Sequence, residues 1–325
     1  MRSRLAPLAL VPLLVAASAP VETARGAPEP DADIGVGIRL VDAPLARRDD
    51  PRAHVYIVDH LRPGDTIERR VEVANRSTRT RDVALYPAAA TVGKEGFDFA
   101  VPNRATNELT GWVRLEKSVL TLKPDARARV KLTITVPESA TAGEHYAVLW
   151  AEVEGERRPS ANVVNVGRAG IRIYLSVGPG GEPPSDFVVD EMTGVRTESG
   201  DPLVTARVRN TGGRALDLRG ELRLTDGPGA LSVGPVAVQM ETLAPGDTRQ
   251  LRIPLDAVVP DGRWQARIVL ASGRVQREAT ATITFGPTRL RSGFVEPTTA
   301  VTIGGVFALL VLVFFGAYAY HRRTR

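Results

Sequence analysis

The chain of 325 residues contains no cysteine, which excludes disulfides, thiol catalysis and cysteine-bound metal centres. Its formal net charge of +5 comes from its two ends. Six of the 42 lysines and arginines, but only one of the 37 acids, lie in residues 1–27 and 321–325, which leaves 36 of each between them. The neutral body lacks the basic footprint of a nucleic-acid-binding protein, and its length predicts two domains.

Residues 1–27 have the pattern of a secretory signal peptide. Met1–Arg4 is positively charged, Leu5–Ala16 is apolar, and Ala17–Ala19 is an A-x-A-like cleavage site. Because Pro20 disfavours cleavage directly after this site, we predict a later cut, near residues 26–27. The alternative is an uncleaved anchor. An exported chain without cysteine suggests a bacterial cell surface.

Residues 28–178 are predicted to form the first β-domain. Alternation of apolar and polar residues indicates strands with one buried face. Strands are expected over 34–41, 55–58 and 66–75, and another at Val83 and Leu85 that is broken at Pro87. The last strands of the domain end at Val177.

The clearest alternation lies in Val119–Val153. Apolar residues at 130, 132, 134 and 136 alternate with polar ones, and Pro137 ends this strand. Gly143 marks a turn before a second strand over 146–153. We interpret the stretch as a hairpin or near-hairpin of a β-sandwich.

The alternation disappears between Gly93 and Gly111. Such a long loop is unusual in a compact sandwich, and long loops are often functional. Its polar groups are our candidate ligand-binding residues, with flanking aromatic rings as a platform for sugars. The polar candidates are Asn103, Arg104, Asn107 and Glu108, and the rings are Phe97, Phe99 and Trp112. The alternative is that the rings fill the core beneath the loop. Trp150 and Trp264 lie in strand patterns and are also expected to be core residues.

After a glycine- and proline-rich linker at 179–185, residues 186–287 are predicted to form a second β-domain. Strand patterns begin near Val204, Leu216, Leu251, Trp264 and Ala279, and turns rich in Gly, Asp and Pro separate them. Short strands at this spacing are typical of a sandwich. Neither domain contains an amphipathic helix pattern.

An internal repeat relates the two domains. Leu122-Lys-Pro-Asp matches Leu243-Ala-Pro-Gly-Asp, each before an alternating strand and a Val-Pro. Gly143 and Gly262 follow in equivalent places, and Asn75 corresponds to Asn210 upstream. The repeat predicts two versions of one immunoglobulin-like unit, so the expected fold class is all-β with two tandem immunoglobulin-like β-sandwiches.

One C-terminal transmembrane helix is expected over 299–320, after a juxtamembrane linker at 288–298. The run is almost entirely apolar and is long enough to cross a hydrocarbon core of about 30 Å. The basic tail 321–325 places the C-terminus in the cytoplasm, which predicts a single-pass type I protein of the cell membrane with most of the chain outside. A buried core helix is the alternative. No sorting motif precedes the span.

No motif for catalysis is visible. The extracellular histidines are His54, His60 and His145, and they are interpreted as surface residues. G-x-S-x-G, H-E-x-x-H and P-loop patterns are missing from the sequence. We therefore expect no enzyme activity, no catalytic residues, no cofactor and no metal.

The residues between Ile34 and Val177 resemble those of the WxL-interacting proteins of Gram-positive bacteria. The resemblance rests on the segments Tyr56–Val58, Pro63–Thr66, Val71–Asn75, Leu120–Pro124, Val136–Pro137 and Gly143–Tyr146, together with Trp112. It implies a peptidoglycan-binding first domain and protein partners for the second. The composition, rich in Ala, Arg, Pro and Gly, indicates an actinobacterial relative. The expected function is a non-enzymatic, membrane-anchored surface protein that binds the cell wall, and the alternative is an envelope scaffold or adhesion protein that docks other surface proteins.

Overall fold

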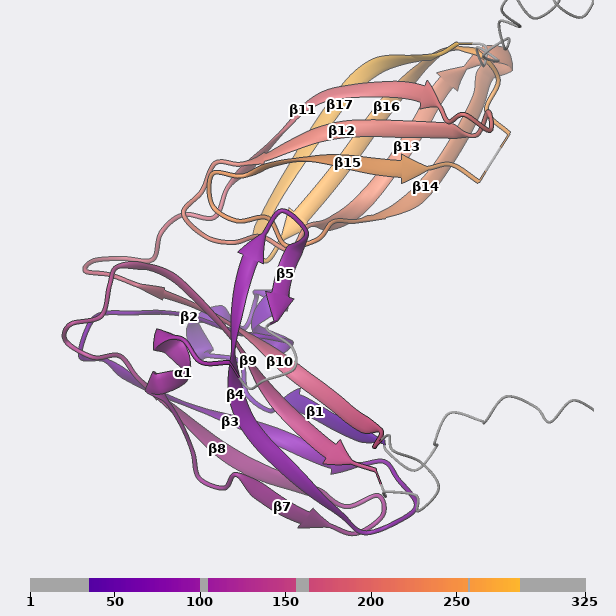
Figure 1. Ribbon diagram of the computed structural model, residues 1–325. Coiled ribbons are helices and arrows are strands. Elements are labelled where there is room, and N and C mark those ends of the chain that lie inside the picture. Colours follow the sequence, from indigo (N-terminus) through magenta and orange to yellow (C-terminus); the bar gives the residue numbers. More distant parts are fainter. Residues whose placement is uncertain (1–34, 100–104, 156–163, 257, 287–325) are drawn as a thin grey trace, which may run out of the picture.

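The computed structural model describes residues 35–99, 105–155, 164–256 and 258–286. Within them the protein is all-β, and its strands form four sheets that make two immunoglobulin-like sandwiches, one above the other (Figure 1). The all-β prediction with two sandwiches is confirmed. The predicted signal peptide and the predicted span at 299–320 lie outside the described residues. Among the described residues, no helix has the length and apolar character needed to span a membrane.

The first sandwich packs two sheets around one core. The first sheet has the order β1 (Val36–Leu40), β3 (Thr66–Asn75), β8 (Arg127–Thr135), β6 (Val113–Leu115). The second has the order β2 (Ile57–Leu61), β10 (Val166–Val177), β9 (Gly143–Glu154), β4 (Arg81–Gly93), β5 (Gly96–Phe99), and β7 (Val119–Leu122) also pairs with β4. Val71, Leu132 and Ile134 from one sheet share the core with Leu149 and Ile173 from the other.

The predicted hairpin within Val119–Val153 is wrong. β8 pairs with β3 and β6, whereas β9 pairs with β4 and β10 in the opposite sheet. The connection between them therefore crosses from sheet to sheet. Alternation reports only that a strand buries one face, and strands on both sides of a sandwich do so toward the same core.

The predicted break at Pro87 is also wrong, because β4 runs through this residue. The amides of Leu85 and Ala89 point away from β9, to the oxygens of Ser118 and Ala105. Since amides alternate in direction along a strand, the missing N–H of Pro87 falls on this outer side, between the segments that pair with β7 and β5.

The interval between Gly93 and Gly111 is not a patternless loop. It contains β5 and a single helical turn, α1 (Glu108–Trp112). Asn107 caps this turn: its side chain accepts a hydrogen bond from the Thr110 amide, and the Thr110 hydroxyl accepts one from the Asn107 amide. Five residues are too few to show a helical period, so only the cap could have predicted the turn.

The second sandwich also packs two sheets around one core. One sheet has the order β11 (Phe187–Arg196), β12 (Pro202–Asn210), β15 (Thr248–Pro254). The other has the order β14 (Leu231–Gln239), β13 (Arg219–Gly227), β16 (Gly262–Ser272), β17 (Val275–Phe285). The chain also contains three short 3-10 turns. In the first sandwich, η1 (Leu45–Arg47) and η2 (Pro51–His54) precede β2, and in the second, η3 (Pro228–Ala230) follows β13. Trp264 and Phe285 are among the largest buried side chains of this core.

The repeat is confirmed by matching hydrogen bonds. The Asn75 Nδ2 group donates to the carbonyl oxygens of Arg79 (2.7 Å) and Leu122 (2.9 Å). The Asn210 Nδ2 group donates to those of Arg214 (2.8 Å) and Leu243 (3.1 Å). Each side-chain oxygen also accepts a bond from the amide two residues later. A buried asparagine thus closes the same turn in both sandwiches.

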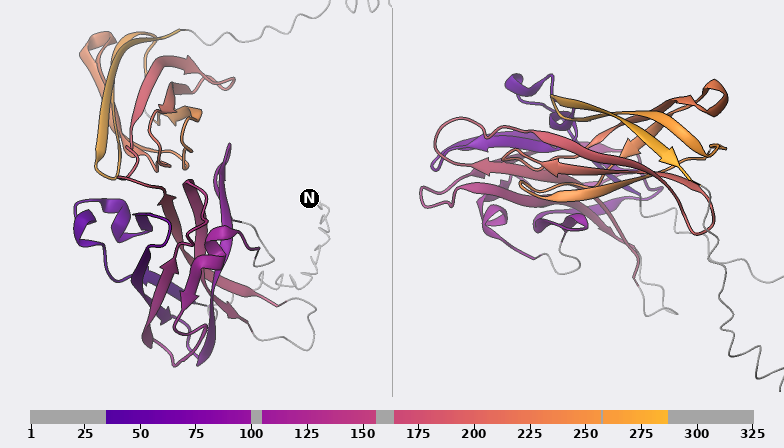
Figure 2. Two further views of the ribbon diagram at one scale, coloured as in Figure 1. Left: turned by 90° about the vertical axis from the view of Figure 1, so that its left-hand side faces the viewer. Right: turned by 90° about the horizontal axis from the view of Figure 1, so that it is seen from above.

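Two segments of the first sandwich reach the second. The β4–β5 hairpin projects toward it (Figure 1), and the Gly93 carbonyl accepts a hydrogen bond from Arg249 at 2.9 Å. The segment with η1 and η2 lies beside the junction (Figure 2, left), where Arg274 contacts the Ala46 carbonyl and Asp49. The sandwiches are therefore in direct contact on both sides of the linker.

Candidate functional site

The outer face of the first sheet is basic. The register places Arg39, Glu72 and Arg129 opposite one another on β1, β3 and β8. Arg127 follows in the next row, and Lys131 lies in the row on the other side. The buried alternate residues of β8 are the apolar ones, so every basic residue of this strand faces water.

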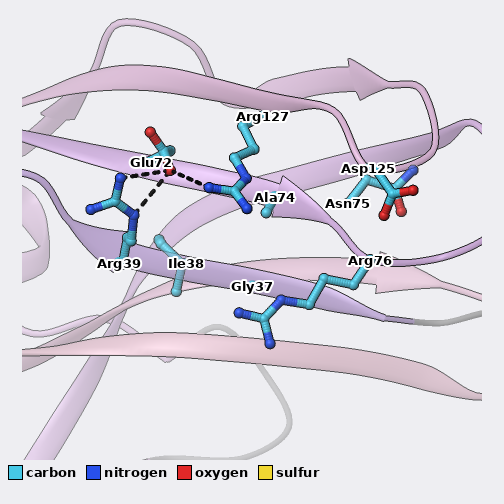
Figure 3. Close-up of a pocket in the computed structure, with 9 residues that line it drawn as sticks. All are labelled: Gly37, Ile38, Arg39, Glu72, Ala74, Asn75, Arg76, Asp125 and Arg127. Atoms are coloured by element: carbon cyan, nitrogen blue, oxygen red, sulfur yellow. Dashed lines mark hydrogen bonds and ion pairs between the residues drawn. The ribbon is translucent and has the colours of Figure 1, made fainter.

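A shallow pocket of about 160 Å³ lies on this face (Figure 3), and we call it the arginine pocket. Its lining consists of Gly37, Ile38, Arg39, Glu72, Ala74, Asn75, Arg76, Asp125 and Arg127. With the adjacent Arg129, four arginines face two acids, which leaves a formal excess of two positive charges.

Glu72 lies at the centre of the arginines. Its carboxylate is 2.8 Å from Arg39 Nη2, 3.5 Å from Arg129 Nε and 3.7 Å from Arg127 Nη1. The Arg39 hydrogen bond, aided by Arg129 and Arg127, holds the pKa of Glu72 below its usual range. The carboxylate is therefore ionised at neutral pH and orients guanidinium groups whose exposed N–H donors remain available.

Arg76 adds a cation without a partner of its own. Its guanidinium lies along β1 over Gly37 (Figure 3), where a Cβ would come within 2.9 Å of Arg76 Nε. Among the described residues, its side chain has no carboxylate or carbonyl partner. A glycine at position 37 thus leaves room for a free guanidinium on the pocket wall.

This arrangement can bind an anion. Guanidinium groups present N–H donors in a planar fork that matches carboxylate and phosphate oxygens. An arginine side chain that Glu72 already orients loses less conformational freedom on binding an anion than a freely solvated arginine does.

The predicted ligand residues occupy a different part of the first domain. Asn103 and Arg104 lie outside the described residues. Asn107 caps α1 and donates to the Tyr146 carbonyl at 2.8 Å, and Glu108 accepts a hydrogen bond from Thr141 at 3.1 Å. Asn107 and Glu108 therefore make contacts within the chain, and their role in ligand binding stays a prediction.

The aromatic platform is largely internal. Phe97 is buried with Tyr146 and Tyr174, with ring centroids 6.1 and 5.2 Å away, and the Phe99 ring meets Trp150 edge-on. Trp112 is buried beside His145. Trp112 therefore fits the alternative in which the rings fill the core, whereas Phe97 and Phe99 pack in a separate cluster that includes Ala215 of the second sandwich.

The three described histidines form hydrogen bonds with groups of the same chain. His54 contacts the Arg48 carbonyl, His60 contacts Ser176 and the Gly180 carbonyl, and His145 contacts the Thr141 carbonyl. In the part of the chain that the structure describes, no group of three His, Asp or Glu side chains could hold a metal ion.

The comparisons with known proteins assign no family to this chain. No family model and no curated protein sequence matches this chain. Similar solved structures include the class 5 fimbriae chaperone CfaA (13% identity, 71% of this chain and 97% of that one, TM-score 0.35). Others are the CsuC–CsuE complex of Acinetobacter baumannii (13%, 71% and 96%, 0.37) and the Salmonella enterica SafA pilin with the SafB chaperone (12%, 70% and 94%, 0.39). The similarity is distant, concerns immunoglobulin-like domains, and assigns no family.

Proposed function

We propose that the protein is a non-enzymatic, membrane-anchored surface protein whose first sandwich binds the cell wall, through an anionic group held in the arginine pocket. The resemblance to the WxL-interacting proteins supports a wall ligand for this domain. Peptidoglycan carries carboxylates on its peptide stems, and other wall polymers carry phosphates. Both groups suit the guanidinium donors.

The observation that carries the proposal is the ring of arginines around Glu72. Arg39, Arg127 and Arg129 converge on one carboxylate, and Arg76 stays free beside them. A purely structural role for the cluster would need only one partner for Glu72. Three partners leave N–H donors in excess, on arginine side chains that are 59%, 68% and 62% exposed.

The test is cosedimentation of the full chain, in mild detergent, with purified wall sacculi. We expect binding that weakens as salt is raised, because exposed charges are screened. The double variant Arg76→Gln/Arg127→Gln should lose about tenfold or more in affinity, as charge-assisted hydrogen bonds are removed. Sacculi stripped of phosphate polymers distinguish a carboxylate ligand from a phosphate ligand.

Arg267→Gln is the matched control, since Arg267 is an exposed arginine of the second sandwich that also pairs with a carboxylate, that of Glu278. Unchanged binding by the double variant, or an equal loss in the control, would rule out the arginine pocket. A protein that stays in the supernatant but retains envelope proteins after wall digestion would instead favour the scaffold alternative.

A further inference from the structure

A second pocket lies where the two sandwiches meet, and we call it the seam pocket. It has a volume of about 190 Å³. The first sandwich contributes Pro51, Arg52, Val55 and Tyr56, and the second contributes Asp217, Arg219, Ala271 and Gly273. None of these residues belongs to the arginine pocket, so the two sites are independent.

The floor of the seam pocket is a buried ion pair. Arg52 Nη2 lies 2.9 Å from Asp217 Oδ2, and each side chain is only 10% exposed. Within the described chain, Arg52 Nε is buried without a hydrogen-bond partner, and Asp217 Oδ2 faces only Arg52 Nη2. Asp217 Oδ1 already accepts hydrogen bonds from Tyr174 and Thr242, whereas Oδ2 can accept one donor besides Arg52, so the floor keeps one acceptor position that the protein itself does not use.

The walls are apolar and partly open. Val55 is 54% exposed, which is unusual for a large aliphatic side chain next to a domain contact. Pro51 and Ala271 continue the apolar surface. The Tyr56 ring is held in place by its contact with Tyr174 (centroids 5.6 Å apart) and by the Arg172 guanidinium above it. An apolar body about the size of one amino-acid residue fits between these walls.

The rim carries a free cation. Arg219 is exposed on β13, directly opposite Ala271 in the register, and its guanidinium has no ion-pair partner among the described residues. The seam pocket is lined by two cations, Arg52 and Arg219, and one anion, Asp217, so it has a formal excess of one positive charge. Its charge therefore complements a single carboxylate.

We propose that the seam pocket binds an N-acylated amino acid with a small apolar side chain and a free carboxylate, the chemistry found at the end of a peptide. The carboxylate pairs with Arg219 at the rim and the side chain rests on Val55 and Tyr56. The amide N–H next to the carboxylate meets Asp217 on the floor, and Arg52 compensates the charge of that acid. Because both sandwiches line the site, the ligand bridges them.

The test is calorimetric titration of the full chain in detergent with N-acetyl-Ala-Ala, prepared as the L,L and D,D forms. The L,L form stands for the end of a protein and the D,D form for the end of a wall peptide, so the preferred form identifies the source. We expect saturable binding of one form, weakened about tenfold or more when its carboxylate is converted to an amide.

Arg219→Gln should weaken binding by a similar factor, whereas Arg223→Gln, an exposed arginine of the same strand that pairs with Glu221, should not. Val55→Asp should also weaken binding, because it places a charged group against the apolar side chain of the ligand and adds a negative charge to a pocket that takes a carboxylate. Failure of both forms to bind, equal binding of acid and amide, or an unchanged Arg219→Gln affinity would overturn the proposal. Wall binding by the arginine pocket is unaffected by any of these results.

Discussion

Glu144 of β9 and Arg214, which precedes β13, form a buried ion pair across the junction of the two sandwiches. Arg214 Nε donates to Glu144 Oε1 at 2.6 Å, and the Ala215 amide donates to Glu144 Oε2 at 2.6 Å. The side chain of Arg214 is 2% exposed and that of Glu144 is 6% exposed. Arg214 also contacts Glu182 of the predicted linker and the Asp59 carbonyl. All five residues belong to one network that fixes the second sandwich on the first.

Removing one partner of this pair should be strongly destabilising. Glu144→Ala leaves Arg214 buried with only part of its compensation, which typically costs about 3–5 kcal/mol. Urea unfolding of the full chain measures the loss. The control is Glu221→Ala, whose pair with Arg223 is exposed and should contribute about 1 kcal/mol or less. Equal effects of the two substitutions would show that the buried pair has no special role.

The junction should also weaken in acid. Burial acts to raise the pKa of Glu182, but Arg47 and Arg214 outweigh it, so its folded pKa lies below the ordinary value of 4.5. Such a group stabilises the folded state above its unfolded pKa, and this contribution is lost as the pH falls from about 4.5 through the folded pKa. We expect Glu182→Gln to lose less stability than the wild type over this acid range. Parallel urea-midpoint curves for the two proteins would contradict the argument.

Local patterns explain what the sequence could predict. Val130, Leu132 and Ile134 alternate with polar residues, so the strand is visible within its own segment. Asn75 and Asn210 are recognisable as a repeat because the same side chain closes the same turn. The partner of a strand is not a local property, which is why β8 and β9 were wrongly paired.

The sites depend on residues far apart in the chain. Glu144 and Arg214 are 70 positions apart, and no periodic pattern connects them. Arg39 and Arg76 join Arg127 only because β1, β3 and β8 are neighbours in one sheet. The neutral net charge of residues 28–320 concealed this basic face. Along β8, basic residues alternate with apolar ones. This pattern is the available sequence signal, and it identifies a solvated strand face without indicating the pocket.

The two asparagines provide a matched pair of stability tests. Asn75→Ala and Asn210→Ala each remove at least three side-chain hydrogen bonds, two donated to carbonyl groups and one accepted from the amide two residues later, at about 0.5–1.5 kcal/mol each. We expect each variant to destabilise its own sandwich by more than about 2 kcal/mol. Hydrogen exchange read separately for the two domains checks this. If one variant loses protection in its own sandwich and the other does not, the two asparagines are not equivalent.

The packing of Gly227 against Trp264 gives the last prediction. A Cβ at position 227 would lie 2.3 Å from the Trp264 ring, which is among the largest fully buried side chains of the second core. Gly227→Ala therefore forces the ring or β13 to move, and overpacking of this kind costs about 1–3 kcal/mol. Urea unfolding followed by tryptophan fluorescence measures the change. Gly111→Ala is the control, because no atom lies near its added methyl group within α1 and alanine favours a helix by about 0.5–1 kcal/mol. If Gly227→Ala is as stable as Gly111→Ala, the close contact between β13 and Trp264 does not limit this position.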